Sequence, residues 1–120
     1  MQRSALAALR TGDEWAKGAR ETYRVARDAC VAALDGAPVK FHVAEGATYL
    51  FIDFAPALAG RPLSVALERA IDRGVLLAPG DAFGRAHATQ ARLCYTSAPL
   101  PRVLDGVARL RDALESLTRE

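Results

Sequence analysis

The sequence has little of several features that mark specialised protein classes. Its net charge is only +2, with acidic and basic residues interspersed along the 120 residues. It contains no basic tract with interleaved aromatic residues, which is the usual footprint of a nucleic-acid-binding surface. No apolar run approaches the roughly 20 residues that span a bilayer. We therefore expect neither a nucleic-acid partner nor a membrane partner.

Cysteine and lysine are both scarce, with two of each. Cys30 and Cys94 have no companions at metal-ligand spacing, which excludes a recognisable metal site. A disulfide between them is one alternative, but two free, buried thiols in a reducing cytosol fit an intracellular chain better. The first fifteen residues turn polar too early for a signal peptide. These features predict a cytoplasmic protein.

The remaining composition is that of an ordinary globular domain, with 51% hydrophobic and 25% charged residues. We expect one domain over residues 1–120, with a helical connector at 1–35 and an α+β body at 36–120. Residues 4–11 predict a short helix that ends before Gly12. Thr11 and Glu14 have the spacing of a capping box, which predicts a second helix starting there.

This second helix is expected to run to about Leu34 and to have two distinct faces. Its charged residues recur at spacings of three and four and mark a solvated face. The apolar face predicted to pack on the core consists of Trp15, Ala19, Tyr23, Ala26, Cys30 and Ala33.

After the second helix, the sequence predicts four strands and two further helices. Alternation predicts strands at 39–43, 48–54, 75–78 and 90–96. Periodicity predicts a helix at 63–74 that buries Leu63, Leu67, Ala70 and Ile71, and a final helix after Ser97 that buries Val103, Val107, Leu110, Leu114 and Leu117. The predicted fold is therefore α+β and two-layered, with a small, mostly antiparallel sheet of about four strands against helices and a long N-terminal connecting helix.

The stretch GVLLAPGDAFG, residues 74–84, ends a strand abruptly. Pro79 cannot donate to a sheet ladder, so the strand is expected to stop there. Gly80 and Gly84 permit backbone conformations that other residues avoid, and they flank Phe83. Either a structural chain reversal or a loop that shapes a binding site explains this pattern.

The order of segments carries a family resemblance. EGATYLFIDF (45–54) is followed by a helix, RGVLLAPGDAFG (73–84), ARLCYTSAP (91–99) and an amphipathic helix. This ordered set resembles the C-terminal small domain of class I/II aminotransferases, which are fold type I enzymes dependent on pyridoxal 5′-phosphate. The resemblance extends back through residues 13–34, which look like the long helix joining the large and small domains of that family.

The resemblance implies a role for Arg92, since it matches the family's arginine that grips the substrate α-carboxylate. A guanidinium fork suits a carboxylate because it makes two parallel, charge-assisted hydrogen bonds. In residues 90–96, Arg92 shares a face with Cys94, opposite the apolar face of Leu93 and Tyr95, so we expect it to point towards a cavity or solvent. The alternative is an arginine on the exposed face of a half-buried strand. By the same resemblance, Gly80, Phe83 and His87 lie on a possible active-site loop.

The family's cofactor machinery is missing from this sequence. Neither Lys17 nor Lys40 matches the cofactor-binding lysine, and the aspartate and phosphate loop of the large domain are also absent. The resemblance therefore implies that pyridoxal 5′-phosphate works in an intact parent enzyme, with none bound to this chain and no catalytic residue of its own. The implied partners are the large cofactor-binding domain and an amino-acid or 2-oxo-acid substrate, in a homodimeric parent.

Other residues offer weaker chemistry. His42 is predicted to be a mid-strand structural or solvated residue, and a nucleophile pair of Cys94 with His87 lacks a group to orient the base. Asp53 and Glu45 suggest paired carboxylates, although solvation at a turn and a strand end explains them better. Tyr49 and Phe51 alternate with Leu50 and Ile52, and an exposed aromatic pair there would indicate a partner surface.

Three hypotheses follow for function. The chain is the small domain of an aminotransferase, contributing the carboxylate arginine and part of a closing lid, and inactive alone. Alternatively, it is a freestanding small-acid-binding or protein-interaction module derived from that fold. The third hypothesis, an independent enzyme, is the weakest because the cofactor lysine is missing.

Overall fold

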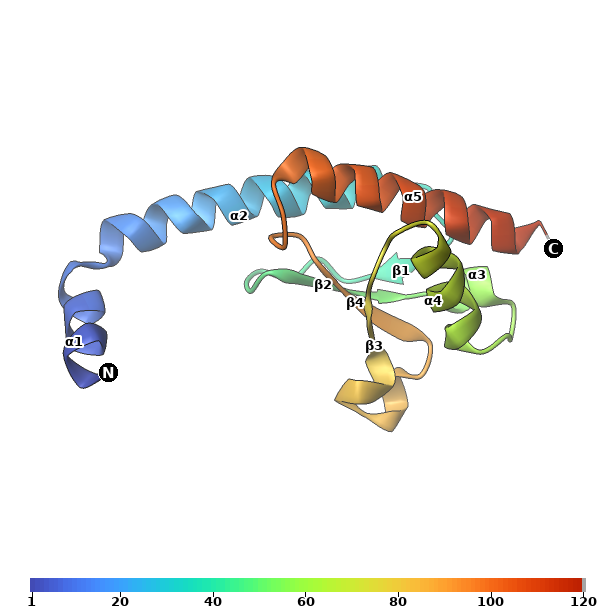
Figure 1. Cartoon of the computed structure of the whole chain (residues 1–120), viewed down its shortest axis with the longest axis horizontal. Coiled ribbons are helices and arrows are strands. Elements are labelled where there is room, and N and C mark those ends of the chain that lie inside the picture. The colour runs from blue at the N-terminus through green and yellow to red at the C-terminus, as the bar shows by residue number, and fades with distance from the viewer. Residues whose placement is uncertain (120) are drawn as a thin grey trace.

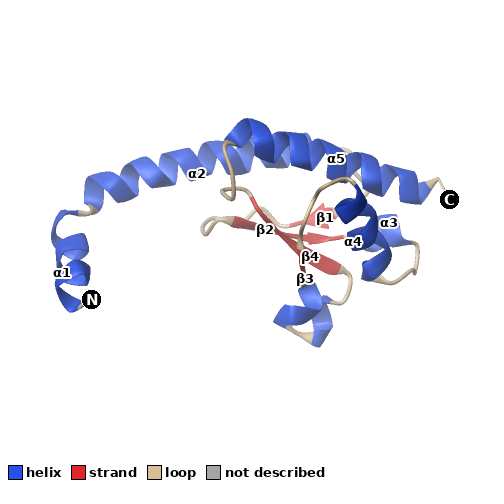
Figure 2. Cartoon of the chain, in the orientation of Figure 1, coloured by secondary structure: helices blue, strands red, loops and turns tan. Residues whose placement is uncertain are grey.

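The computed structural model describes residues 1–119 and places helices on one face of a four-stranded sheet (Figures 1 and 2). The helices and strands in chain order are α1 (Gln2–Thr11), α2 (Asp13–Ala33), β1 (Lys40–Phe41), β2 (Tyr49–Asp53), α3 (Ala55–Leu58), α4 (Leu63–Asp72), β3 (Ala78–Pro79), β4 (Gln90–Cys94) and α5 (Leu100–Thr118). Two short 3₁₀ turns, η1 (Gly80–Phe83) and η2 (Arg85–His87), separate β3 from β4.

The sheet has the strand order β1-β2-β4-β3, and all three neighbouring pairs are antiparallel. The centre is the β2–β4 pair, whose register runs from Tyr49 opposite Cys94 to Asp53 opposite Gln90. The predicted α+β class with a small antiparallel sheet of about four strands is confirmed.

Alternating burial shows which face of the sheet forms the core. Leu50 and Ile52 of β2 are fully buried, and so are Ala91 and Leu93 of β4 to within a few per cent. Tyr95, just beyond β4, continues this buried face. Side chains alternate along a strand, so the residues between them lie on the opposite, open face.

Helix α5 covers the core face together with α2 and α4 (Figure 1). Its five predicted core residues, Val103, Val107, Leu110, Leu114 and Leu117, are all buried. The 3.6-residue periodicity of this segment therefore predicted the buried face correctly.

The N-terminal arm differs from the sequence-based expectation. Helix α2 starts after Gly12 without a side-chain cap, and the Thr11 hydroxyl donates back to the Ala7 carbonyl at 2.9 Å instead. The predicted capping box is therefore wrong. Trp15, expected on the packed face, is 75% exposed, whereas Ala26 and Cys30 further along the same face are buried. The reason is that the first half of α2 projects beyond the sheet, so within residues 1–119 neither the sheet nor α5 covers the start of its apolar face (Figure 1).

Three shorter segments also differ from the predictions. Ile71 is 54% exposed, and Ala66 takes its place in the buried stripe of α4. Strand β1 ends at Phe41, so His42 follows the strand and is exposed, where a mid-strand position was predicted. Within the segment expected at 75–78, only Ala78 pairs with β4, and Pro79 completes β3.

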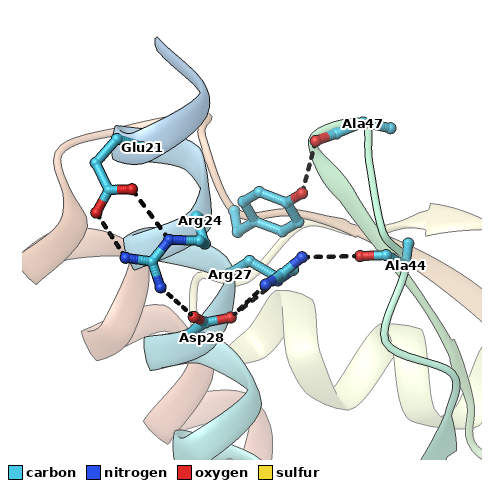
Figure 3. Close-up of polar contacts among 7 residues, drawn as sticks. Glu21, Arg24, Arg27, Asp28, Ala44 and Ala47 are labelled. Atoms are coloured by element: carbon cyan, nitrogen blue, oxygen red, sulfur yellow. Dashed lines mark hydrogen bonds and ion pairs between the residues drawn. The ribbon is translucent and has the colours of Figure 1, made fainter. Parts of the chain in front are cut away.

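Hydrogen bonds from α2 and from the residue after β4 hold the loop between β1 and β2 (Figure 3). Arg27 donates to the Ala44 carbonyl at 3.1 Å, and the Tyr95 hydroxyl donates to the Ala47 carbonyl at 2.7 Å. On the exposed side of α2, Arg24 binds Glu21 at 2.6 Å, and this hydrogen bond lowers the pKa of the Glu21 carboxyl. The charged face predicted for this helix is thus solvated, and its neighbouring face fixes the loop.

Both cysteines are free thiols, but their environments differ. Cys30 is fully buried under the sheet, and burial raises the pKa of its thiol to about 11. Cys94 is only half-buried because it lies on the open face, so the expectation of two buried thiols holds for Cys30 alone.

The raised pKa of Cys30 predicts a loss of stability at alkaline pH. The unfolded chain releases the thiol proton near pH 9, whereas the folded chain holds it to about pH 11. The folded state therefore binds more protons in this window, and stability falls as pH rises through it. We expect Cys30 to account for about 2 kcal/mol of the loss between pH 8 and pH 10.5. Guanidinium unfolding at both pH values checks this: Cys30→Ala should lose that much less than the wild type, and an equal loss in both would contradict it.

Candidate functional site

The open face of the sheet gathers aromatic and polar side chains from β2 and β4. The antiparallel register sets them opposite one another in three cross-strand pairs, which are Tyr49 with Cys94, Phe51 with Arg92, and Asp53 with Gln90. All six are half-buried or exposed, in contrast to the buried residues between them. The prediction that Arg92 and Cys94 share the face opposite Leu93 and Tyr95 is confirmed.

Arg92 lies among aromatic rings at the centre of this face. Its guanidinium carbon lies over the Tyr49 ring, 4.3 Å from the centroid, and 5.0 Å from the centroid of Phe83. Among residues 1–119, no acidic side chain pairs with Arg92, and none of its N–H groups has a hydrogen-bond acceptor. A partly buried guanidinium with five unused donors is suited to bind a planar oxyanion.

The two 3₁₀ turns carry Phe83 and His87 over the same face. Phe83 makes a T-shaped contact with the Phe51 ring at 5.8 Å between centroids, and His87 makes a second one at 5.1 Å. His87 Nδ1 lies 2.6 Å from the Gln90 amide oxygen. An amide oxygen only accepts, so this bond places the proton of a neutral imidazole on Nδ1 and leaves Nε2 as an acceptor.

Glycines determine how closely this loop can approach β4. Gly80 is buried, and a Cβ at this position would collide with the backbone carbonyl oxygens of His87 and Gln90. Gly84 joins the two turns with φ +138°, a conformation that residues with side chains rarely adopt. Gly80 is therefore a close-packing residue at the start of the loop, and Phe83 and His87 are the side chains that reach the open face.

Two hollows adjoin Arg92. The larger, about 760 Å³, lies on the open face and is lined by both histidines, Lys40, Asp53 and the β2 aromatic residues. A second hollow of about 470 Å³ lies between β3 and the start of α5 and includes Arg102. Arg92 is among the residues that border both hollows.

The structure does not assemble the weaker candidate sites. Residues 1–119 contain no group of three His, Cys, Asp or Glu side chains that could hold a metal ion. The Cys94 thiol contacts Thr96, while His87 is bonded to Gln90, so the proposed nucleophile pair is not formed. Asp53 accepts a hydrogen bond from the Ala55 N–H at the start of α3, which is a structural role.

The residues present do not fit pyridoxal 5′-phosphate by themselves. Lys17 is exposed on the projecting part of α2, and Lys40 is exposed on the edge strand β1, opposite Asp53 in the register. Neither side chain is enclosed, as a lysine that holds this cofactor covalently would need to be.

Sequence reasoning missed the contact between Tyr49 and Arg92. Alternation placed Tyr49 on the face opposite Leu50 but did not identify the residue that it contacts. The signal was present in the pattern, because pairing strand 48–54 with strand 90–96 puts every second residue of both on one face. What the pattern omits is the register, which decides that Tyr49 lies diagonally beside Arg92.

The curated proteins that resemble this chain in sequence include two aminotransferases. No protein-family model matches the chain. It is 29% identical over 107 residues to 4-dedimethylamino-4-oxo-anhydrotetracycline transaminase OxyQ of Streptomyces rimosus, which covers 89% of this chain and 28% of the relative. It is 32% identical over 97 residues to the LL-diaminopimelate aminotransferase of Oleidesulfovibrio alaskensis, covering 80% and 24% respectively.

The fold has solved counterparts in the same group. The α-aminoadipate aminotransferase LysN of Thermus thermophilus, complexed with N-(5′-phosphopyridoxyl)-L-leucine, matches with a TM-score of 0.79 and 25% identity over 92% of this chain and 29% of that one. The chain thus spans about a quarter of the length of the relatives it matches. No helix within residues 1–119 has the length and hydropathy needed to cross a membrane. In sequence and in fold the chain is therefore similar to a segment, about a quarter of the length, of pyridoxal-phosphate-dependent aminotransferases, which is consistent with a C-terminal part of such an enzyme.

Proposed function

We propose that this chain supplies the arginine that binds the substrate α-carboxylate in an aminotransferase, which transfers an amino group between an amino acid and a 2-oxo acid. The observation that carries the proposal is the state of Arg92. It is partly buried on the open face, beside two hollows, without an acidic partner among residues 1–119. A structural ion-pair role would require such a partner.

The loop from Gly80 to His87 supports this assignment. It places Phe83 against Arg92 and His87 against Phe51, so it borders the space that a carboxylate bound to Arg92 would occupy. We propose that the loop forms part of a lid over the substrate. Closing an apolar wall over a charge-assisted hydrogen bond strengthens that bond because water is excluded.

The proposal requires a larger partner. The relatives are about four times longer than the matched region, and this chain lacks a lysine suited to the cofactor. We propose that a large domain contributes the pyridoxal 5′-phosphate site and that the parent enzyme is a homodimer. The cofactor, when bound there, supplies the electron sink for amino-group transfer, and this chain orients the substrate by its carboxylate.

One prediction tests whether the chain acts alone. Mixed with pyridoxal 5′-phosphate, it should show at most weak, non-specific attachment to Lys17, Lys40 or the amino terminus. It should give no amino-group transfer between alanine and 2-oxoglutarate, because nothing in residues 1–119 encloses the cofactor. Absorbance titration and a coupled assay measure both quantities. Tight binding at one cofactor per chain, with turnover, would contradict the proposal and favour an independent enzyme.

A second candidate function is a freestanding module that binds small acids. It is favoured by the fact that Arg92, both rings that touch it and the hollow of about 760 Å³ are complete within this chain. The two candidate functions predict different results when a cofactor-binding large domain is added to this chain and amino-group transfer is measured. In the aminotransferase, that domain should restore amino-group transfer, whereas a freestanding module should gain nothing from it.

A further inference from the structure

The aromatic contacts of Arg92 lead to an inference that rests on the proposed function. We propose that Tyr49 and Phe83 are positioning residues, which hold the Arg92 guanidinium with its N–H fork turned towards the carboxylate. Both rings lie within 5.0 Å of the guanidinium carbon. One ring comes from β2 and the other from η1, so the arginine is held by two separate parts of the chain.

The physical basis is the way in which a guanidinium uses its faces and its edges. A cation over an aromatic ring is attracted by the electrons of the ring face. The N–H donors of a guanidinium lie in its plane, so a ring against its face leaves those donors available. An acidic neighbour would hold the arginine equally well but would occupy the donors. The absence of such a neighbour among residues 1–119 leaves the rings as the groups that restrain Arg92.

A series of ring contacts anchors the second of these positioning residues. Phe83 meets Phe51 at 5.8 Å, Phe51 meets His87 at 5.1 Å, and His87 is bonded to Gln90 at the start of β4. Edge-to-face pairs of this kind add to the stability of a cluster. The position of the loop and the order of Arg92 are therefore coupled, because displacing η1 would remove one of the two rings.

Burial in the core does not account for the two rings. Tyr49 is 38% exposed and Phe83 is 49% exposed, which leaves much of each ring in contact with solvent. The cation over each ring face accounts for an aromatic residue at these two partly exposed positions.

Side-chain NMR of the 120-residue chain tests this inference with pyruvate as the probe, a 2-oxo acid with one carboxylate. The readouts are the Arg92 Nε–Hε signal without ligand and its change during the titration. The ring currents of Tyr49 and Phe83 should displace the chemical shift of the Arg92 Nε–Hε signal upfield. Tyr49→Leu and Phe83→Leu should each remove part of this displacement. Each should also weaken Arg92-dependent pyruvate binding by about two- to fivefold. Tyr49→Phe keeps the ring and should retain wild-type binding. Trp15→Leu removes an exposed ring far from the site and serves as the matched control.

The possible results separate this inference from the proposed function. If Arg92→Lys abolishes binding while both leucine variants bind pyruvate as the wild type does, the positioning role is overturned and the carboxylate role stands. An undisplaced Arg92 signal in the free wild type would also overturn the positioning role. If Arg92→Lys binds pyruvate unchanged, the proposed function itself fails. Thermal unfolding of each variant identifies any loss of binding that results from loss of the fold.

Discussion

Replacing Arg92 by lysine is expected to lower kcat/KM for amino-acid and 2-oxo-acid substrates by about tenfold to a hundredfold in an aminotransferase assembled with this domain. Lysine keeps the positive charge but loses the two-point fork. A hydrogen bond to a charged group contributes about 1.5–3 kcal/mol, which corresponds to that range in rate. Steady-state kinetics with both substrate types measures the loss.

The fold should be unaffected by the same change. Arg92 lies on the open face and has no ion-pair partner among residues 1–119, so Tm should stay close to that of the wild type. Arg10→Lys, in the exposed helix α1, is the control for an arginine replacement and should change neither quantity. Unfolding of Arg92→Lys would mean that the arginine is structural. Unchanged kinetics would move the carboxylate contact to another residue.

Replacing Phe54 by alanine is expected to cause the largest loss of stability. Phe54 is fully buried where β2 passes into α3, and its N–H donates to the Thr89 carbonyl at 2.9 Å. Removing such a ring costs about 3–5 kcal/mol, because it combines lost burial with a residual cavity. That is a large fraction of the roughly 5–15 kcal/mol that stabilises a typical domain.

The control for this prediction is Ile71→Ala in α4. Ile71 was predicted from periodicity to be buried, yet it is 54% exposed, so its loss should cost no more than about 1 kcal/mol. Guanidinium unfolding of both variants provides the comparison. Similar losses for Phe54 and Ile71 would contradict the core that the structure describes.

The two helices α5 and α2 show how far periodicity alone can predict burial. In α5 every predicted core residue is buried, because the helix packs against α2, α3 and α4 along its length. In α2 the same rule predicts Trp15 as well as Cys30, and only Cys30 is buried. Periodicity identifies which side of a helix is apolar, but whether anything covers that side depends on tertiary structure.

For the candidate site, the sequence predicted the face on which Arg92 lies but not the rings that contact it. Alternation in residues 90–96 correctly predicted the side of the sheet on which Arg92 lies, and the family resemblance suggested its role. The contact with Tyr49 depends on the register between strands about 40 residues apart in the chain. The contact with Phe83 depends on two 3₁₀ turns that Gly80 and Gly84 allow but that no simple residue pattern specifies.

The aromatic residues Tyr49 and Phe51 of β2 both lie on the open face of the sheet. Tyr49 is 38% exposed and contacts Arg92, and Phe83 from the loop contacts both Arg92 and Phe51. Exposed aromatic residues that are grouped on one face are typical of ligand-binding and partner-binding surfaces. The arrangement therefore agrees with a face that meets a substrate and a partner domain.

The most direct test of this account is a crystal structure of an aminotransferase assembled with this domain and soaked with a non-reactive carboxylate analogue of its substrate. The account predicts that both carboxylate oxygens lie within hydrogen-bond distance of the Arg92 guanidinium, which remains between Tyr49 and Phe83. A carboxylate bound by other residues, with Arg92 paired to an acidic group of the large domain, would contradict it.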